Sequence, residues 1–410
     1  MPPKSILVIG GGLSGVFLAQ ELADFGYKLN LVEKLPSIGG ILLDLGKVFP
    51  TDDCALCYPS AARFTDGGFR KCQFRTQVQF HPKINLFTNS ELETYERNGG
   101  KFHAVIRKRR FGIYESKCVG CGECITACQA THEEDTQIPI RFYHSQAVPR
   151  VPYISKEDCD RCGKCIDVCE PGAINFDWED ETIELDADVV VFATGFQEMT
   201  PYTILREFGY GELPRVITQV ELAHFLDPLR VKGKKDLDID QKTLFNHVVM
   251  ITCIGSRDQR YYAYCSRICC TYTLKHALML REKDIEVTVC FMDIRTPGFI
   301  EDYYLRCRAK GVNFIRGRPN LVEWDAETES LVVEFEDTLA QQSKHLQADL
   351  VVLATALFPR HTDRYTGNEL ETTVEGEFKA GSMIEPRNIP ETIRDVDALC
   401  LRIVKYLGSP

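Results

Sequence analysis

Residues 5–33 read SILVIGGGLSGVFLAQELADFGYKLNLVE and decide the fold of the first half of the chain. The short apolar run at 5–9 is typical of a buried parallel strand. A glycine-rich turn and a helical pattern follow, and a second apolar run at 29–32 ends at Glu33. This order of strand, GxGxxG turn, helix, strand and acidic residue predicts a dinucleotide-binding unit.

The residue types in this turn suit a bound diphosphate. Glycines let the backbone approach a pyrophosphate at the N-terminus of a helix, and the acidic residue can accept hydrogen bonds from a ribose. A glycine-rich turn in an ordinary α/β unit is the alternative, but the complete strand–helix–strand unit favours the dinucleotide. The predicted binding residues are Gly10, Gly12, Ser14, Gly15, Glu33 and Lys34.

The second half of the chain repeats the first. Residues 248–252 align with 5–9, residues 285–293 echo the strand that ends at Glu33, residues 312–336 repeat the strands predicted around a hairpin at 84–110, and residues 346–357 (LQADLVVLATAL) echo 185–196 (LDADVVVFATGF). This internal duplication predicts two nucleotide-binding units in one chain.

The phosphate loop of the second copy is missing. Residues 248–281 read VVMITCIGSRDQRYYAYCSRICCTYTLKHALMLR, and only Gly255 survives of the glycine motif. Asp293 could still face a ribose, but without the glycines there is little room for a pyrophosphate, so we expect no nicotinamide site. Instead, four thiols within 18 residues of one strand-to-helix turn predict a metal centre. They are Cys253, Cys265, Cys269 and Cys270.

Residues 113–178, inserted in the first copy, hold two cysteine runs. Both have the spacing C-x2-C-x2-C-x3-C of bacterial ferredoxins, in which the fourth cysteine of each run binds the other cluster. We therefore assign Cys118, Cys121, Cys124 and Cys169 to one [4Fe-4S] cluster, and Cys159, Cys162, Cys165 and Cys128 to the other. Structural zinc is the alternative, although zinc sites do not normally use paired four-cysteine runs. The 30 residues between the runs predict a surface excursion around His132 to Arg150.

Composition excludes several classes of function. The 410 residues are 44% hydrophobic, which is enough for two or three folded domains. A net charge of −11 argues against binding to nucleic acid and against a polybasic membrane-binding surface on the protein. The N-terminus is a predicted strand rather than a signal peptide, so the 18 cysteines indicate metal ligation rather than disulfides. These features predict a cytoplasmic protein.

Other short motifs resemble the two-dinucleotide flavoproteins of the disulfide-reductase type. Gly39-Gly40 resembles their second glycine pair, and Ala193-Thr194-Gly195 resembles a turn that passes close to FAD in that class. The resemblance implies FAD in the first copy. It also implies that the closing helix, predicted to start at Ile389, returns its N-terminus to the flavin.

Nearly the whole chain resembles the A subunit of heterodisulfide reductase. The matching motifs are GGGLSG, FPTDDCALC at 49–57, the two-cluster insert, CIGSRD followed by YCSRICC, and NIPET. The resemblance implies that Cys253, Cys265, Cys269 and Cys270 hold a third [4Fe-4S] cluster beside the flavin. It also implies that Lys275 lies by the flavin, with an exposed helix lysine as the alternative. The chain resembles a short form, similar to the A subunit of a quinone-interacting membrane-bound oxidoreductase.

We therefore expect an α/β flavoprotein like thioredoxin reductase, with an inserted α+β ferredoxin domain. The predicted segments are an FAD domain at 1–112, 179–216 and 346–410, the insert at 113–178, and a degenerate NAD-type domain at 217–345. The predicted function is electron relay, with or without flavin-based bifurcation, between FAD and three [4Fe-4S] clusters. The expected setting is a dimer in a larger heterodisulfide reductase-like or quinone-linked complex, which meets the membrane only through a partner.

The alternative is a freestanding NAD(P)H-dependent disulfide or polysulfide reductase that uses Cys54 and Cys57. Together with Cys72, these thiols could also ligate a further cluster or stay free. Three other cysteines are expected to be small core residues. They are Cys290, Cys307 and Cys400.

Overall fold

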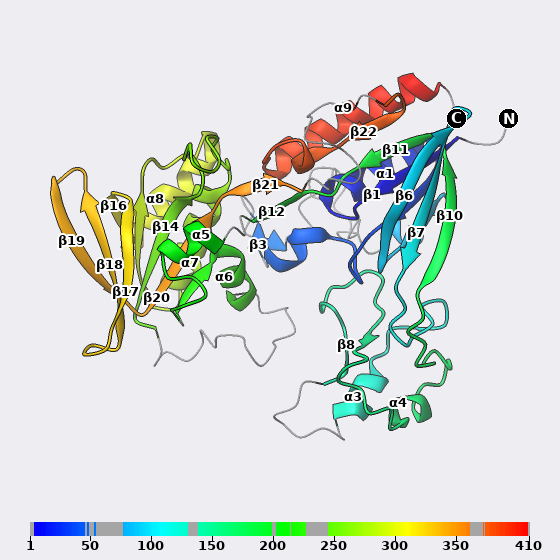
Figure 1. Ribbon diagram of the computed structural model, residues 1–410, viewed down its shortest axis with the longest axis horizontal. Helices are drawn as coiled ribbons and strands as arrows, with labels where there is room; N and C mark the ends of the chain where they lie inside the picture. Colours follow the sequence, from blue (N-terminus) through cyan, green and yellow to red (C-terminus); the bar gives the residue numbers. More distant parts are fainter. Residues whose placement is uncertain are drawn as a thin grey trace, which may run out of the picture.

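The structure is a computed structural model that describes residues 4–45, 47–48, 53–54, 77–129, 138–198, 202–213, 215–226, 245–360, 372 and 374–408. It contains two α/β units of matching topology and a small unit inserted into the first (Figure 1). Among the described residues, no helix is both long enough and apolar enough to cross a membrane.

The first unit is built on a five-stranded parallel sheet. Its order is β22 (Glu377–Lys379), β11 (Val189–Phe192), β1 (Ser5–Ile9), β2 (Lys28–Val32) and β5 (Ile84–Phe87). Helix α1 (Leu13–Phe25) connects β1 to β2 and packs against α9 (Ile389–Leu407), which returns from the end of the chain. Leu22 and Ile403 are fully buried where the apolar faces of these helices meet.

A three-stranded antiparallel sheet covers the other face of this unit. It consists of β6 (Ser90–Asn98), β7 (Lys101–Lys108) and β10 (Glu181–Ala187). Gly99 and Gly100 form the predicted hairpin turn, and both have a positive φ, which glycine adopts without strain. The inserted unit follows β7 and precedes β10, so it lies at the far end of these strands (Figure 1).

The inserted unit is small and has little regular structure. Its elements are α3 (Glu123–Gln129), β8 (Ile140–Arg141), β9 (Tyr153–Ile154) and α4 (Lys164–Asp167). The expected surface excursion is wrong for its described part, residues 138–150, because Val148 is buried in the core of the first unit. The Ile38 N–H donates to the Val148 carbonyl (2.9 Å), and the Val148 N–H donates to Ser37 Oγ (2.8 Å). Residues 130–137 lie outside the described residues.

The second unit repeats the topology of the first. Its parallel sheet has the order β13 (Val216–Thr218), β20 (Leu350–Thr355), β14 (His247–Ile254), β15 (Glu286–Phe291) and β16 (Asn313–Arg316). An antiparallel sheet follows, built from β17 (Pro319–Asp325), β18 (Ser330–Asp337) and β19 (Gln342–Ala348). Helices α6 (Gln219–Leu226), α7 (Cys269–Arg281) and α8 (Glu301–Ala309) pack together beside the parallel sheet.

Two predicted domain boundaries, at 216/217 and at 345/346, are wrong. Strand β20 pairs with β14 in parallel, so the closing strand of the second copy belongs to the second sheet. Helix α5 (Tyr202–Glu207) contributes Ile204 and Leu205 to the core around Val249, so it also packs with the second unit. The units are joined by a ribbon of β12 (Phe196–Glu198) and β21 (Leu357–Pro359). The remaining elements are η1 (Gly40–Leu45), β3 (Lys47–Val48), β4 (Asp53–Cys54), η3 (Gly298–Ile300) and η4 (Gly381–Met383).

Candidate dinucleotide site and cysteine centres

The glycine turn after β1 is tightly packed except on one side. A Cβ at Gly10 would lie 2.4 Å from the Ala193 carbonyl oxygen, and a Cβ at Gly15 would lie 1.8 Å from the Gly10 carbonyl oxygen. A Cβ at Gly12 would meet no atom within 4 Å, although Gly12 is the N-cap residue of α1. The open side of the turn is therefore at the helix N-terminus, where backbone N–H groups bind a diphosphate. This shape fits a dinucleotide.

Glu33 lies at the base of the same turn. Its carboxylate accepts hydrogen bonds from the Gly11 N–H (2.7 Å) and the Leu35 N–H (2.8 Å). Burial of this side chain raises the pKa of Glu33, and the backbone donors oppose that shift. Lys34 differs from its neighbour, because its half-exposed ammonium pairs with Glu91 (3.1 Å). The Lys34 contact to a cofactor therefore stays a prediction.

Segments far apart in the sequence surround the glycine turn. The Gly39 N–H donates to the Gly11 carbonyl (2.8 Å), and a Cβ at Gly40 would lie 3.1 Å from the Gly12 Cα atom. A Cβ at Gly381 would lie 1.9 Å from Ser14 Oγ. The predicted second glycine pair and the turn before α9 therefore both contact the glycine turn.

The turn after β11 is held by the loop that leaves the second unit. Thr194 Oγ1 donates to the Arg360 carbonyl (3.0 Å), and the Arg360 N–H donates to the Gly195 carbonyl (2.9 Å). Arg360 follows directly after β21, and sequence reasoning missed it. Its contact depends on the pairing of β12 with β21, which no local motif indicated.

Helix α9 begins at Ile389, as predicted. Asn388 Oδ1 accepts from the Glu391 N–H (2.8 Å), and Glu391 Oε2 accepts from the Asn388 N–H (3.0 Å). This reciprocal pair is a capping box, which satisfies two backbone donors at the end of the helix. The partial positive charge of the helix N-terminus therefore has a fixed position.

The inserted unit gathers its cysteines around two cavities. One cavity has an empty volume of about 360 Å³ and the other about 310 Å³, and both have largely apolar walls. The first is lined by Cys118, Cys121, Cys124 and Cys169, and the second by Cys128, Cys159, Cys162 and Cys165. Each cavity thus collects three thiols of one run and the fourth thiol of the other.

The charge state of these thiols depends on a bound cation. Burial, followed by the neighbouring thiols Cys118 and Cys121, raises the pKa of Cys124 to about 12. Burial likewise raises the pKa of Cys165 to about 11. Metal coordination deprotonates such thiols. The zinc alternative needs one central ion, and in the described part of the chain no group of three or more His, Cys, Asp or Glu side chains is arranged to hold one.

Three of the four cysteines that replace the phosphate loop lie together. Cys253 is the penultimate residue of β14 and has a left-handed backbone (φ 64°), and Cys269 and Cys270 begin α7. All three are at most 3% exposed. The hydrogen bond with the Cys269 thiol, helped by a hydrogen bond with Thr252 and by the charge of Arg257, lowers the pKa of Cys253 despite burial.

Cys265 lies apart from these three in its contacts. Its sulfur accepts a hydrogen bond from the Arg267 N–H (3.4 Å), and within the described residues it shares no hydrogen bond with another cysteine. The structure therefore brings Cys253, Cys269 and Cys270 together, and ligation by Cys265 stays a prediction.

Arg257 is a residue of this centre that sequence reasoning missed. Its Nη2 donates to Asp293 Oδ2 (2.8 Å), so the acid that could have faced a ribose is engaged by the replaced phosphate loop. The Cys270 Sγ in turn donates to the Asp293 carbonyl (3.6 Å). The visible signal was an arginine two residues after the surviving Gly255.

Lys275 reaches from the second unit to the first. Only 3% of this residue is exposed, and its Nζ donates to the Leu45 carbonyl (3.1 Å) at the end of η1. The alternative of an exposed helix lysine is therefore wrong. The next residue, His276, is also buried, and its Nδ1 bonds Gln219 Oε1 (2.5 Å). Burial lowers the pKa of His276, which keeps the imidazole neutral.

The remaining cysteines divide into core thiols and thiols without a described environment. Cys290, Cys307 and Cys400 are at most 3% exposed, as expected of small core residues. Cys54 is in β4, but its side chain lies outside the described residues, and so do Cys57 and Cys72. The predictions for these three residues stay predictions.

Two segments of the sequence match known families. Residues 8–44 match the NAD(P)-binding Rossmann-like domain, and residues 71–174 match the 4Fe-4S dicluster domain. The first segment contains the glycine turn and Glu33. The second contains all eight cysteines of the inserted unit.

Longer relatives match over almost the whole chain. The chain is 38% identical to the iron-sulfur A subunit of the CoB–CoM heterodisulfide reductase of Methanocaldococcus jannaschii, over 95% of the chain and 62% of that protein. It is 34% identical to the A subunit of the H2:CoB–CoM heterodisulfide,ferredoxin reductase of Methanothermobacter marburgensis, over 97% of the chain and 63% of that protein. The chain spans between 53% and 65% of the length of the curated relatives it matches.

Solved structures share the fold at low identity. The bacillithiol disulfide reductase of Bacillus cereus superposes with a TM-score of 0.52 at 14% identity, over 98% of the chain and 99% of that protein. The thioredoxin reductase of T. acidophilum has a TM-score of 0.50 at 12% identity, over 99% of both chains. These likenesses confirm the predicted thioredoxin reductase-like fold.

Proposed function

We propose that the chain is the electron-relay subunit of a heterodisulfide reductase-like complex, because it is 34–38% identical to heterodisulfide reductase A subunits over 95–97% of its length. It would hold FAD in the first unit and [4Fe-4S] clusters in the inserted unit and at the cysteine turn of the second. The terminal donor and acceptor would be bound by other subunits of that complex, and the chain would meet a membrane only through such a partner.

The observation that carries this proposal is the crossed grouping of cysteines in the inserted unit. Cys169 lines the cavity of the first run, and Cys128 lines the cavity of the second. That arrangement supports two [4Fe-4S] clusters with crossed ligands. In such a pair, each cluster is bound by three cysteines of one run and by the fourth cysteine of the other run. Two clusters held side by side suit one-electron transfer through the unit.

The first unit supplies what FAD requires. Gly12 leaves space at the N-terminus of α1 for the pyrophosphate, and Glu33 lies where a ribose would follow. The turn at Gly195 and the N-terminus of α9 would face the flavin end of the cofactor. When bound, FAD would accept or donate two electrons in all and pass them to or from the clusters one at a time.

The cysteine turn of the second unit is proposed to hold a third [4Fe-4S] cluster. Cys253, Cys269 and Cys270 would supply three ligands, and Cys265 would close onto the cluster as the fourth. Lys275 projects from the same helix to η1 of the first unit. Its ammonium would stabilise negative charge on the cofactor, because a buried cation interacts strongly at low effective dielectric.

Val148 provides a contact between the inserted unit and the dinucleotide turn. It bonds Ile38, and the Ile38 side chain packs at Gly11, where a Cβ would lie 2.7 Å from Ile38 Cγ2. This packing gives a short protein connection between the insert and the proposed FAD site. This contact supports the proposed role of the insert as a relay.

Anaerobic purification with counting of iron and flavin tests the proposal. We expect about 12 iron atoms and one FAD per chain, because each [4Fe-4S] cluster contributes four irons. About eight irons would refute the third cluster alone. About four irons, or the absence of FAD, would refute the relay as proposed.

The freestanding NAD(P)H-dependent disulfide reductase is the weaker proposal. The Asp293 carboxylate, which a nicotinamide ribose would need, is bound by Arg257. Rapid reduction of the flavin by NADH or NADPH alone would reverse this preference.

A further inference from the structure

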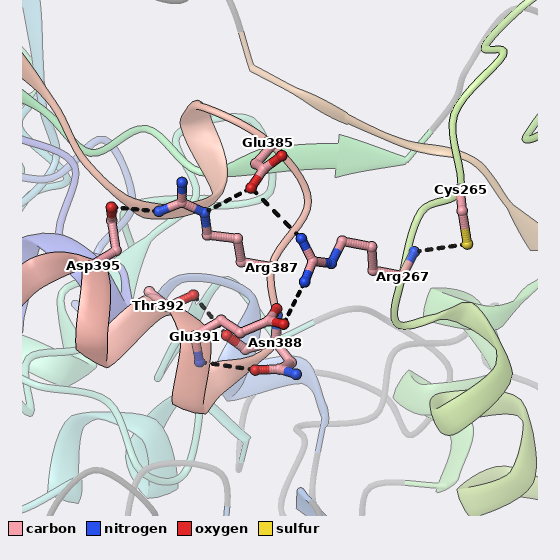
Figure 2. A network of polar contacts seen from close by, with 8 residues as sticks. All are labelled: Cys265, Arg267, Glu385, Arg387, Asn388, Glu391, Thr392 and Asp395. Atoms are coloured by element: carbon pink, nitrogen blue, oxygen red, sulfur yellow. Dashed lines mark hydrogen bonds and ion pairs between the residues drawn. The ribbon is translucent and has the colours of Figure 1, made fainter. Parts of the chain in front are cut away.

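Arg267 lies in the loop between Cys265 and Cys269. Its backbone contacts Cys265, and its side chain contacts the first unit. It has a φ of 65°, in the left-handed region that non-glycine residues seldom adopt. Its backbone N–H donates to Cys265 Sγ (3.4 Å). Because the backbone is turned toward the sulfur, the side chain leaves the loop on the opposite side, toward the first unit (Figure 2).

The guanidinium of Arg267 binds two carboxylates of the first unit. Nη2 donates to Glu391 Oε1 in the first turn of α9, and Nη1 lies 3.6 Å from Glu385 Oε1 (Figure 2). Glu391 is also fixed by the capping box, since its other oxygen accepts from the Asn388 N–H. Arg267 therefore binds a carboxylate whose position is set by the helix backbone.

The polar contacts continue from Glu385 to the glycine turn. Glu385 Oε1 accepts from Arg387 Nε (3.4 Å), and Arg387 Nη1 pairs with Asp395 Oδ1 (2.5 Å) (Figure 2). Asp395 Oδ2 accepts from the Gly381 N–H (2.8 Å). Since Gly381 packs directly against Ser14 of the glycine turn, the network joins the cysteine loop to the dinucleotide site.

We propose that Arg267 is a positioning residue that clamps the cysteine loop of the second unit to the N-terminus of α9 in the first. The clamp holds the cysteine centre at a fixed place relative to the dinucleotide site. The expected effect on electron transfer rests on the proposed function. The clamp itself does not, because it rests on the contacts of Arg267.

The contacts of Arg267 differ from those of a merely stabilising ion pair. Isolated surface ion pairs contribute little to folding, and Arg267 is 44% exposed in its side chain. The pair nevertheless joins two rigid points, a helix cap and a strained loop residue. Its loss should therefore change the position of the loop more than the stability of either unit.

Arg267→Gln, purified anaerobically with its cofactors, tests the proposal through two readouts. The first is hydrogen exchange of the loop around Arg267 and the first turn of α9, which we expect to be about tenfold faster than in the parent. The second is the single-turnover rate of electron transfer between FAD and the cysteine centre, followed by stopped-flow absorbance. We expect a severalfold decrease, because electron transfer slows steeply as the two centres move apart.

Two further variants make the test specific. Arg206→Gln removes an exposed ion pair with Glu212 in the second unit, and both readouts should stay at parental values. Glu385→Gln removes one carboxylate of the network far from the sulfurs, and we expect a smaller change in the same direction. If Arg267→Gln loses iron, the two readouts are compared between Glu385→Gln and the parent instead. Parental values in Glu385→Gln would then overturn the clamp.

The outcomes distinguish this inference from the proposed function. Parental exchange and parental electron transfer in Arg267→Gln, or equal losses in Arg206→Gln, would overturn the clamp. If the parent protein lacks FAD or a cluster at these cysteines, the proposed function fails. The hydrogen-exchange comparison would still test the clamp.

Discussion

Glu198 should make the stability of the chain fall as pH rises toward neutrality. It ends β12, in the ribbon that joins the two units. Its carboxylate accepts hydrogen bonds from Thr218 Oγ1 (2.9 Å) and Thr355 Oγ1 (3.1 Å). Burial raises the pKa of Glu198 to about 7, and Glu221 adds to the shift, while the threonine hydroxyls oppose it.

The sign follows from proton linkage. The folded chain keeps the Glu198 proton up to about pH 7, whereas the unfolded chain releases it near the usual 4.5. The folded state therefore binds more protons between these values, and its stability decreases as pH rises through this window. At 1.36 kcal/mol per pKa unit, the loss amounts to at most about 3 kcal/mol.

Glu198→Gln removes the titration while keeping an acceptor for a threonine hydroxyl. We expect the urea concentration at the unfolding midpoint of the parent to decrease as the pH rises from 5 to 8, relative to that of the variant. Glu212→Gln, at an exposed position of the same unit, should follow the parent at every pH. Parallel pH profiles for the parent and Glu198→Gln would refute the reasoning, because the carboxylate would then have the same pKa in both states.

Three other substitutions test the sites. Two double serine variants test the crossed ligands. Cys169→Ser with Cys118→Ser removes two ligands of one cluster and should lose about four irons, whereas Cys169→Ser with Cys165→Ser removes one ligand of each cluster and should lose about eight. The opposite result would contradict the assignment. Lys275→Gln should lower the two-electron midpoint potential of the flavin by about 30–60 mV, because a charge-assisted bond contributes roughly 1.5–3 kcal/mol; an unchanged potential in a spectroelectrochemical titration would count against it. Gly12→Ala adds a methyl group to open space, so the circular dichroism should stay parental while the dissociation constant for FAD rises about tenfold or more; unchanged affinity would place the pyrophosphate elsewhere.

Local chemistry made much of the fold predictable. The glycine turn requires a backbone without side chains, so its spacing alone located the strand, helix and acid around Gly10 to Glu33. The cysteine runs were equally direct, because a cluster needs thiols at short fixed intervals. The start of α9 at Ile389 could be read from the proline and glutamate in its first turn.

Other features depended on contacts between distant segments. The boundary at 345/346 failed because a strand sequence does not say which sheet it joins, and β20 pairs with β14. The expected excursion failed because Val148 is buried against the first unit, which its own neighbours in sequence do not indicate.

The sequence by itself determined the two nucleotide-binding copies, the two cysteine runs and the four cysteines that replace a phosphate loop. Each of these is a short-range pattern, and short-range patterns report which atoms can bind a given group. Only the tertiary structure decided that Lys275 reaches Leu45, that Arg257 engages Asp293, and that Arg267 binds Glu391. These contacts form when the two units pack against each other or when a loop folds back on its own sheet. Their geometry is therefore set by the burial of whole helices and sheets and not by the residues beside them in the chain.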